Sequence, residues 1–257
     1  MAGWFDSHVH LDFWRIEEVP GVIRDAKEKG VERILTVGRG VLSSAANVWI
    51  ANHFDNVLTG VAIHPIWPDV LDNKAYKELK ALTSDKKVVA IGEAGIGIGR
   101  SPETRDPQRL KFARCIRLGR ETGLPIIIHN DRESGPDIIE IFKKENGMEV
   151  GGVMHSTMID INSARPLWEM GVYISIGRQI NNPDFKYLEE VVKQVPEDRL
   201  MVETDSAGGG PLPHHRNDAT PAKLLDVAAT VAKLRNTTME HLRQVSVANT
   251  EKLLHLS

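Results

Sequence analysis

The chain has 257 residues, 41% of them hydrophobic and 26% charged, which is the usual balance of a folded globular protein. These values exclude a disordered, collagen-like or coiled-coil chain, and the length suits one large domain over residues 1–257. The formal net charge of −3 gives no reason to expect tight nonspecific binding to nucleic acid.

The sequence shows no targeting or membrane-spanning segment. Residues 1–6 lack a basic region followed by an apolar run, and no apolar stretch approaches the roughly 20 residues that cross a bilayer. The single cysteine, Cys115, cannot form an internal disulfide and suits a reducing compartment. We therefore expect a cytoplasmic protein without a membrane partner, and a monomer is compatible with the sequence.

Short apolar runs alternate along the chain with longer amphipathic ones. The short runs are rich in Val and Ile, as buried parallel strands are, and cover residues 4–9, 33–37, 57–63, 88–91, 125–128, 152–154, 172–176 and 200–202. The helical patterns cover residues 16–29, 42–53, 73–84, 104–122, 136–146, 162–170, 184–194, 220–234 and 239–254. Gly30, Gly123 and Gly171 each stand between a helix and the next strand, where a left-handed helix cap is favoured.

Eight strands that alternate with helices predict an α/β fold, a (β/α)8 TIM barrel with its active site at the C-terminal ends of the strands. An open doubly wound sheet is the alternative with the same order of elements. Residues 207–219 follow the eighth strand and are rich in glycine and proline, which indicates an active-site loop rather than a domain boundary.

Histidines and carboxylates stand at the ends of six of these strands. They are His8, His10, His64, Glu93, His129, His155 and Asp205. In a barrel such ends converge on one face, and converging imidazoles and carboxylates are what a divalent metal requires. Any one of these histidines alone is more often an ordinary polar residue than a ligand, but their joint placement favours a metal site.

The spacing of these residues suggests how they share two ions. His8 and His10 are two residues apart on a strand, so their side chains leave the same face and can reach one ion. Glu93 has two oxygens and could bridge two ions, with His129 and His155 completing a second site. Two ions about 3.5–4 Å apart clamp the attacking and leaving oxygens of a displacement. Asp205 is placed to bind the first ion and to accept a proton from the attacking water.

Two further patterns are weaker. The glycine-rich residues 92–99 match neither a dinucleotide fingerprint nor a P-loop, and they predict a tight turn that lets backbone approach the site. Lys111, Arg114, Arg117 and Arg120 step by three along a predicted helix. We interpret them as a solvated outer face that pairs with Glu121 or a neighbouring helix, because barrel helices lie away from the strand ends.

The assembled segments resemble the TatD-like family of metal-dependent hydrolases, within the amidohydrolase-type barrels. The matching segments are residues 6–12 (DSHVHLD), 62–65 (AIHP), 90–95 (AIGEAG), 124–129 (LPIIIH), 152–155 (GVMH), 173–177 (YISIG) and 202–205 (VETD). The resemblance implies a binuclear centre in which His8, His10 and Asp205 hold one ion. It implies that His129 and His155 hold the other, with Glu93 between them, and that phosphoester bonds, those of DNA included, are hydrolysed.

Residues beside these ligands depart from the family pattern. Gly97 stands where the family usually has an aspartate, and the arginine after His129 is shifted by one position to Arg132. Segments 156–158 and 206–208 also differ from the usual residues. Metal binding is therefore more firmly indicated than the substrate. A DNA substrate would favour stacking aromatics near the cleft, and aromatic residues make up only 5% of this chain.

We predict a metal-dependent hydrolase with two divalent ions per chain and Asp205 as the general base. His64 and Arg216 are the candidate substrate contacts. The ligand types suit Zn, Mn, Co or Ni, and the family resemblance also allows Mg. The first hypothesis is a phosphodiesterase or deoxyribonuclease whose partner is a phosphoester such as single-stranded DNA. The alternatives are an amide, lactone or phosphotriester hydrolase on the same site, and a metal-binding protein without turnover.

Overall fold

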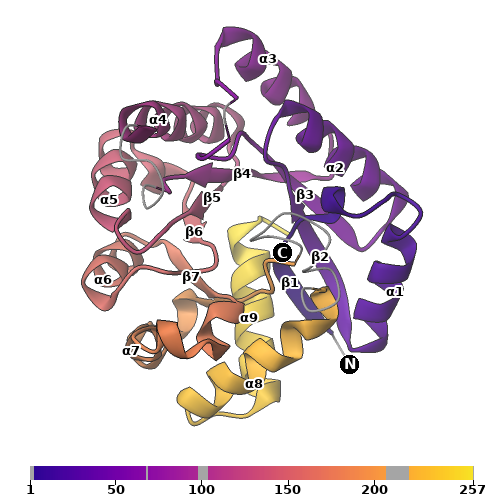
Figure 1. Ribbon diagram of the computed structural model, residues 1–257, viewed down its shortest axis with the longest axis vertical. Helices are drawn as coiled ribbons and strands as arrows, with labels where there is room; N and C mark the ends of the chain where they lie inside the picture. The colour runs from indigo at the N-terminus through magenta and orange to yellow at the C-terminus, as the bar shows by residue number, and fades with distance from the viewer. Residues whose placement is uncertain (1–2, 68, 98–103, 207–219, 257) are drawn as a thin grey trace.

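The computed structural model describes residues 3–67, 69–97, 104–206 and 220–256. Its eight parallel strands form one sheet in sequence order, and helices surround it (Figure 1). The strands are β1 (Trp4–Val9), β2 (Val31–Val37), β3 (Val57–Val61), β4 (Val88–Gly95), β5 (Ile126–His129), β6 (Gly152–Met154), β7 (Tyr173–Ile176) and β8 (Leu200–Val202). The helices are α1 (Val19–Glu28), α2 (Val41–His53), α3 (Asn73–Leu82), α4 (Arg105–Thr122), α5 (Gly135–Lys144), α6 (Ile161–Glu169), α7 (Leu188–Gln194), α8 (Leu224–Leu234) and α9 (Met239–Leu253). The predicted (β/α)8 barrel is confirmed, and the open sheet is excluded.

The barrel closes between β1 and the segment after β8, through main-chain hydrogen bonds and through hydrogen bonds to the Asp6 carboxylate. The Asp205 amide donates to the His8 carbonyl and the His10 amide donates to the Ser206 carbonyl, each over 3.0 Å. Beside them, the buried Asp6 carboxylate accepts hydrogen bonds from the Thr204 amide at 3.0 Å and the Thr204 hydroxyl at 2.6 Å. These bonds tie the segment that carries Asp205 to the strand that carries the two histidines.

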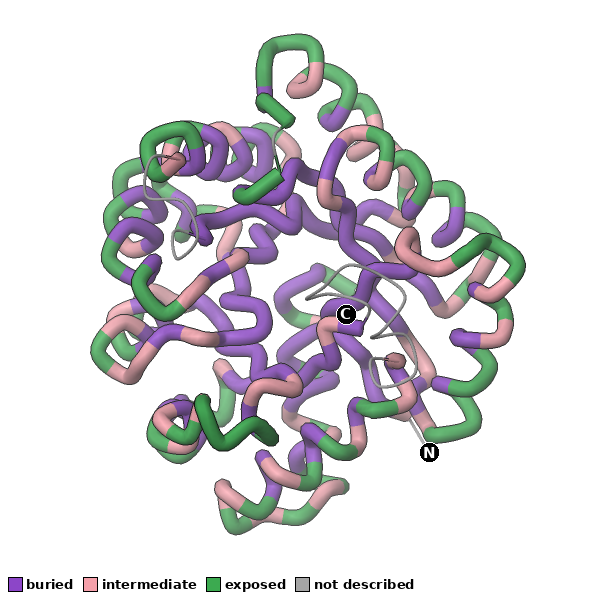
Figure 2. Tube along the Cα trace, in the orientation of Figure 1, coloured by how far each residue is buried: buried purple, intermediate pink, exposed green. Residues whose placement is uncertain are grey.

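The buried apolar side chains form two cores, and Figure 2 shows that burial is concentrated on the central strands and on the inner sides of the helices. The larger core lies between the strands and the surrounding helices, whose outward faces are exposed. The smaller core joins side chains from every strand, among them Phe5, Ile127 and Met201, with Val247 and Leu253 of α9. Residues of strands on opposite sides can touch only across the barrel interior, so α9 packs against one end of that interior. The strand ends that carry His8, Glu93 and His129 lie at the other end.

Most predicted boundaries agree with the structure within a few residues. Gly30, Gly123 and Gly171 adopt φ values of +84°, +72° and +88°, which confirms the predicted left-handed caps. The helix predicted over residues 184–194 is too long at its start, because Pro183–Phe185 is a 3-10 turn and α7 begins only at Leu188. No helix in the described ranges combines the length and apolarity needed to cross a bilayer.

The glycine-rich turn predicted at residues 92–99 is wrong for its first half. Strand β4 continues through Gly92 and Glu93 to Gly95, four residues beyond its predicted end. A side chain at Gly92 would overlap Ile127 of β5, and one at Gly95 would overlap the backbone of His129. The glycines therefore let β4 and β5 approach closely where each delivers a functional side chain.

Candidate metal centre

The six predicted metal ligands lie together where the strands end. His8 belongs to β1, Glu93 to β4 and His129 to β5, whereas His10, His155 and Asp205 follow their strands within three residues. The side chains of His8, His10, Glu93 and His155 are buried, and those of His129 and Asp205 are 17% and 15% exposed. The site thus opens to solvent on the side of His129 and Asp205.

The first half of the site contains the two histidines of the first strand. Their Nε2 atoms lie 3.3 Å apart, as the two-residue spacing predicts. Glu93 Oε2 lies 3.6 Å from His8 Nε2 and 3.3 Å from His10 Nε2. Asp205 Oδ1 lies 3.5 Å from His10 Nε2 and 4.0 Å from His8 Nε2. Two imidazoles and two carboxylates therefore face one point.

The second half gathers around the other oxygen of Glu93. Oε1 lies 2.5 Å from His129 Nδ1 and 2.7 Å from His155 Nε2. The rings of His8 and His155 stack with their centroids 3.8 Å apart, so the two halves are in contact. Each carboxylate oxygen of Glu93 consequently faces its own group of histidines.

His64 joins this second half, although the sequence pointed only to a substrate contact. Its Nε2 lies 3.1 Å from Glu93 Oε1, and its ring centroid lies 4.3 Å from that of His129. The side chain is 8% exposed. Arg216, the other predicted substrate contact, lies outside the described residues.

The donor atoms fit a divalent metal. Among the described residues, three overlapping groups have ligand atoms within 4.8 Å of one another: His8, His155 and Asp205; His8, His10 and Glu93; and His64, Glu93 and His129. Nδ1 of His8 is buried and has no hydrogen-bond partner in the described part of the chain. Imidazole with carboxylate is a donor set that suits Zn, Mn, Co or Ni.

The electrostatics of the cluster keep its carboxylates ionised. Burial opposes the charge on Glu93, but His64, His155 and His129 outweigh it and hold the pKa of that carboxyl well below its usual range. Burial likewise opposes a charge on His10, yet Asp205 and Glu93 raise the pKa of that imidazole to about 10. Without metal, protons on histidine thus balance the negative charge that a cation would otherwise balance.

Sequence reasoning missed Glu203, which contacts the His155 ring at the nitrogen that faces away from Glu93. Its buried carboxylate accepts hydrogen bonds from the Ser156 amide at 2.5 Å and the Ser7 hydroxyl at 3.2 Å, and lies 3.3 Å from His155 Nδ1. Similarly, His10 Nδ1 lies 3.0 Å from the Val37 carbonyl. Such partners orient a ligand ring so that its other nitrogen faces the metal. The available signal was an acid directly after the apolar residues 200–202.

The basic stripe on α4 behaves as predicted except at one position. Arg117 forms a bidentate ion pair with Glu145 at 2.7 Å, and Arg120 pairs with Glu149. Lys111 is different, because it is buried and its Nζ donates to backbone carbonyls of the segment after β3. The interpretation as a solvated face is therefore wrong for Lys111, which turns inward toward the site.

A family model, similar sequences and a similar solved structure all indicate the same protein family. Residues 5–255 match the family model described as TatD related DNase. The chain is 32% identical over 254 residues to the uncharacterized metal-dependent hydrolase YabD of Bacillus subtilis, covering 98% of this chain and 99% of that protein. It is also 32% identical to YcfH of Escherichia coli K12, another uncharacterized metal-dependent hydrolase, covering 98% and 95% of the two chains. The crystal structure of YjjV, a TatD homologue from Escherichia coli K12, superposes with a TM-score of 0.90 over 99% of this chain and 98% of its own, at 21% identity.

Proposed function

The chain belongs to the TatD-related DNase family of metal-dependent hydrolases, and from that premise we propose that it hydrolyses phosphodiester bonds, including those of DNA, with two divalent ions. One observation carries the proposal: the two oxygens of Glu93 face two separate groups of histidines. A single carboxylate in that position can bridge two cations, the arrangement that suits an in-line displacement at phosphorus. We further propose one domain over residues 1–257 and a cytoplasmic location, with which a monomer is compatible.

The proposed ligand sets follow the two halves of the site. His8, His10 and Asp205 would hold one ion, His129 and His155 the other, and Glu93 both. When bound, such ions supply Lewis-acid polarisation of a phosphoryl group and activation of water. We propose that the ions are Zn, Mn, Co, Ni or Mg. Imidazole ligands suit Zn, Mn, Co and Ni, and the carboxylate ligands also suit Mg.

Asp205 is the proposed general base. Burial opposes its ionisation, but the hydrogen bond with His10 and the charges of neighbouring histidines hold the pKa of the carboxyl below its usual value. It is therefore ionised near neutral pH and can accept the proton of an attacking water at its carboxylate. The Asp6–Thr204 hydrogen bonds hold the adjoining backbone, so the carboxylate has a defined position.

His64 and a basic rim are the proposed substrate contacts. Burial lowers the pKa of His64 to about 4, so its ring is neutral near pH 7 and would bind substrate as a hydrogen-bonding group. Arg132 follows His129 by three residues, is exposed, and packs over the Tyr187 ring at 4.7 Å. With Arg216, it is the proposed contact for substrate phosphate.

The experiment is metal reconstitution with a substrate panel. Metal-stripped protein is reloaded with Zn, Mn, Co, Ni or Mg and assayed on single-stranded DNA, a simple phosphodiester, a phosphomonoester and a lactone. We expect metal-dependent cleavage of DNA and the diester, lowered about 100-fold or more in Asp205→Asn. The matched control is Asp198→Asn, because that carboxylate is 68% exposed and pairs only with Arg199 among its described neighbours.

Two other results would overturn the proposal in different ways. Cleavage of the lactone alone would retain the metal site but assign the alternative hydrolase. About two bound ions without turnover on any substrate would indicate a metal-binding protein.

A further inference from the structure

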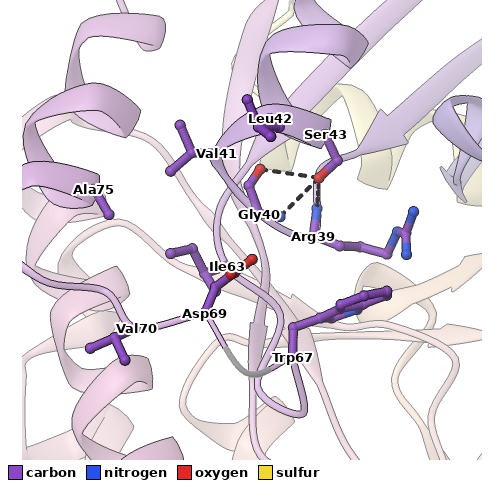
Figure 3. Close-up of a pocket in the computed structure, with 10 residues that line it drawn as sticks. All are labelled: Arg39, Gly40, Val41, Leu42, Ser43, Ile63, Trp67, Asp69, Val70 and Ala75. Atoms are coloured by element: carbon purple, nitrogen blue, oxygen red, sulfur yellow. Dashed lines mark hydrogen bonds between the residues drawn. The ribbon is translucent and has the colours of Figure 1, made fainter.

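A pocket of about 360 Å³ opens between the start of α2 and the segment after β3 (Figure 3). Its apolar wall consists of Val41, Ile63, Val70 and Ala75. Trp67 and Arg39 line it too, and in Figure 3 their side chains extend to the same side, away from Val70 and Ala75. A pocket of this size accommodates part of a small organic ligand.

The pocket shares a backbone turn with the metal centre. Ile63 directly precedes His64, whose ring contacts Glu93, and the Trp67 amide donates to the His64 carbonyl over 3.3 Å. If the reacting group of a substrate lies at Glu93, the part of the substrate next to that group would therefore lie near Trp67.

A series of ring contacts leads from the metal centre to Trp67. The His10 and Phe13 rings meet edge to face at 5.8 Å. The Arg39 guanidinium carbon lies 3.4 Å from the Phe13 ring centroid and 5.0 Å from the Trp67 ring centroid. Asp12 forms an ion pair with the guanidinium at 2.7 Å and holds it in place. The indole thus has a fixed cationic neighbour, while the residue itself stays 42% exposed.

The buried Lys111 of α4 binds the backbone of the same segment after β3, which contains His64 and Trp67. Its Nζ donates to the carbonyls of His64 and Pro65 at 3.2 Å and to that of Trp67 at 2.9 Å. The lysine is buried, so these three bonds replace its solvation. Trp67 is consequently presented from a segment that three hydrogen bonds hold, which lowers the entropy cost of stacking a ligand on it.

The polar groups of the pocket disfavour a phosphate there. The Asp69 carboxylate lines it and would repel an anion. The Ser43 hydroxyl is already engaged, because it accepts from the amides of Arg39 and Gly40 and donates to the Gly40 carbonyl. The pocket therefore suits the uncharged, flat part of a ligand rather than its phosphate.

We infer that Trp67 and this pocket bind a nucleobase of the substrate, next to the phosphoester that lies at the metal centre. The inference rests on the proposed function and names a subsite for it. Recognition is by stacking, since the Ser43 hydroxyl is committed to backbone, and stacking accepts any base because every base has a π face. The subsite therefore distinguishes a base-bearing strand from an abasic one without reading its sequence.

The test measures binding separately from cleavage. Metal-loaded full-length protein is titrated with a hydrolysis-resistant phosphorothioate oligothymidylate, and with an abasic phosphorothioate strand of equal length. We expect Trp67→Ala to weaken binding of the oligothymidylate on the order of tenfold, and Trp67→Phe to restore most of it. Binding of the abasic strand should be the same in all three proteins.

Trp49→Ala is the matched control. Trp49 is 50% exposed, but it lies on α2 against His53, with ring centroids 3.8 Å apart, away from the pocket. Thermal unfolding of each variant shows whether the fold is intact.

The outcomes separate this inference from the proposed function. Equal loss for both strands, no loss in Trp67→Ala, or no binding of oligothymidylate by the parent protein would each overturn the nucleobase subsite. Metal-dependent cleavage of DNA combined with oligothymidylate binding that is indifferent to Trp67 would leave the proposed function standing without this subsite. Trp67-dependent binding without any cleavage would leave the subsite standing without the proposed function.

Discussion

Oε1 of Glu203 lies 3.3 Å from Nδ1 of His155, and the other nitrogen of that ring lies 2.7 Å from Glu93. The ring is therefore held between a carboxylate that belongs to the cluster and one behind it. Because an imidazole presents its free electron pair on the nitrogen opposite its N–H, a proton at Nδ1 leaves Nε2 available for a metal.

Glu203→Gln should lower metal affinity about 10- to 100-fold, because an amide no longer favours the proton at Nδ1. Metal affinity measured by competition with a chromogenic chelator checks this. Glu149→Gln serves as the control, because that side chain is 57% exposed and pairs with Arg120 far from the cluster. Unchanged metal affinity in Glu203→Gln would mean that the Glu203 carboxylate serves its hydrogen bonds with Ser156 and Ser7 and does not orient His155.

Lys111→Met should destabilise the protein by about 1–3 kcal/mol, because three backbone carbonyls would each lose the hydrogen bond from the ammonium. Denaturant unfolding measures the change. The exposed Lys193 pairs only with Glu189 among its described neighbours, so Lys193→Met should cost about 0.5 kcal/mol or less. Equal losses in the two variants would contradict a structural role for the buried ammonium.

Gly95→Ala should displace the end of β5, because a Cβ there would overlap the His129 carbonyl. We expect a stability loss of about 1–3 kcal/mol together with weaker metal uptake. Gly21 in α1 has only the flexible Arg24 near its Cβ position, so Gly21→Ala should be neutral or stabilise by about 0.5–1 kcal/mol. Thermal unfolding with and without metal distinguishes the two, and full metal uptake by Gly95→Ala would refute the predicted displacement.

The Arg117–Glu145 ion pair should make the free energy of unfolding decrease at acidic pH. The hydrogen bond from Arg117 outweighs partial burial and lowers the pKa of Glu145 below its ordinary value of 4.5. A depressed pKa in the folded state adds stability above pH 4.5, and this stability is lost as the pH falls through the folded-state pKa. Glu145→Gln should therefore cost about 1 kcal/mol at pH 7 and progressively less below pH 4.5. Urea titrations of both proteins at several pH values test this, and a cost that stays constant with pH would contradict it.

Metal binding should release protons and raise the melting temperature. The pKa of His10 is about 10 without metal, so the ring is protonated at pH 7 and must lose that proton to become a ligand. Metal affinity should therefore increase with pH. Calorimetric titration in two buffers of different ionisation enthalpy measures the proton release, and an identical heat in both buffers would contradict it. At a free metal concentration 100 times the Kd, stability should rise by about 2.7 kcal/mol.

The sequence by itself determined the alternation of strands and helices and the members of the cluster at the strand ends, and it favoured the barrel over an open sheet. Val- and Ile-rich runs alternating with amphipathic segments specify parallel strands with outer helices, because each element must bury its apolar face. Once the strands are parallel and the barrel closes, their carboxyl ends lie on one face. His8, His10, Glu93, His129, His155 and Asp205 could therefore be grouped from the sequence alone.

Only the tertiary structure decided which atoms meet and what supports them. The contact of Glu203 with His155, the three carbonyls held by Lys111, and the stacking of Arg39 on Phe13 and Trp67 join residues that no local pattern relates. Asp6 and Thr204, which seal the barrel, are 198 positions apart. Periodicity reports which face of an element is buried, but the partner of a buried polar group depends on packing between distant segments. That packing placed His64 against Glu93 and turned Lys111 inward, where the pattern of the helix had indicated solvent.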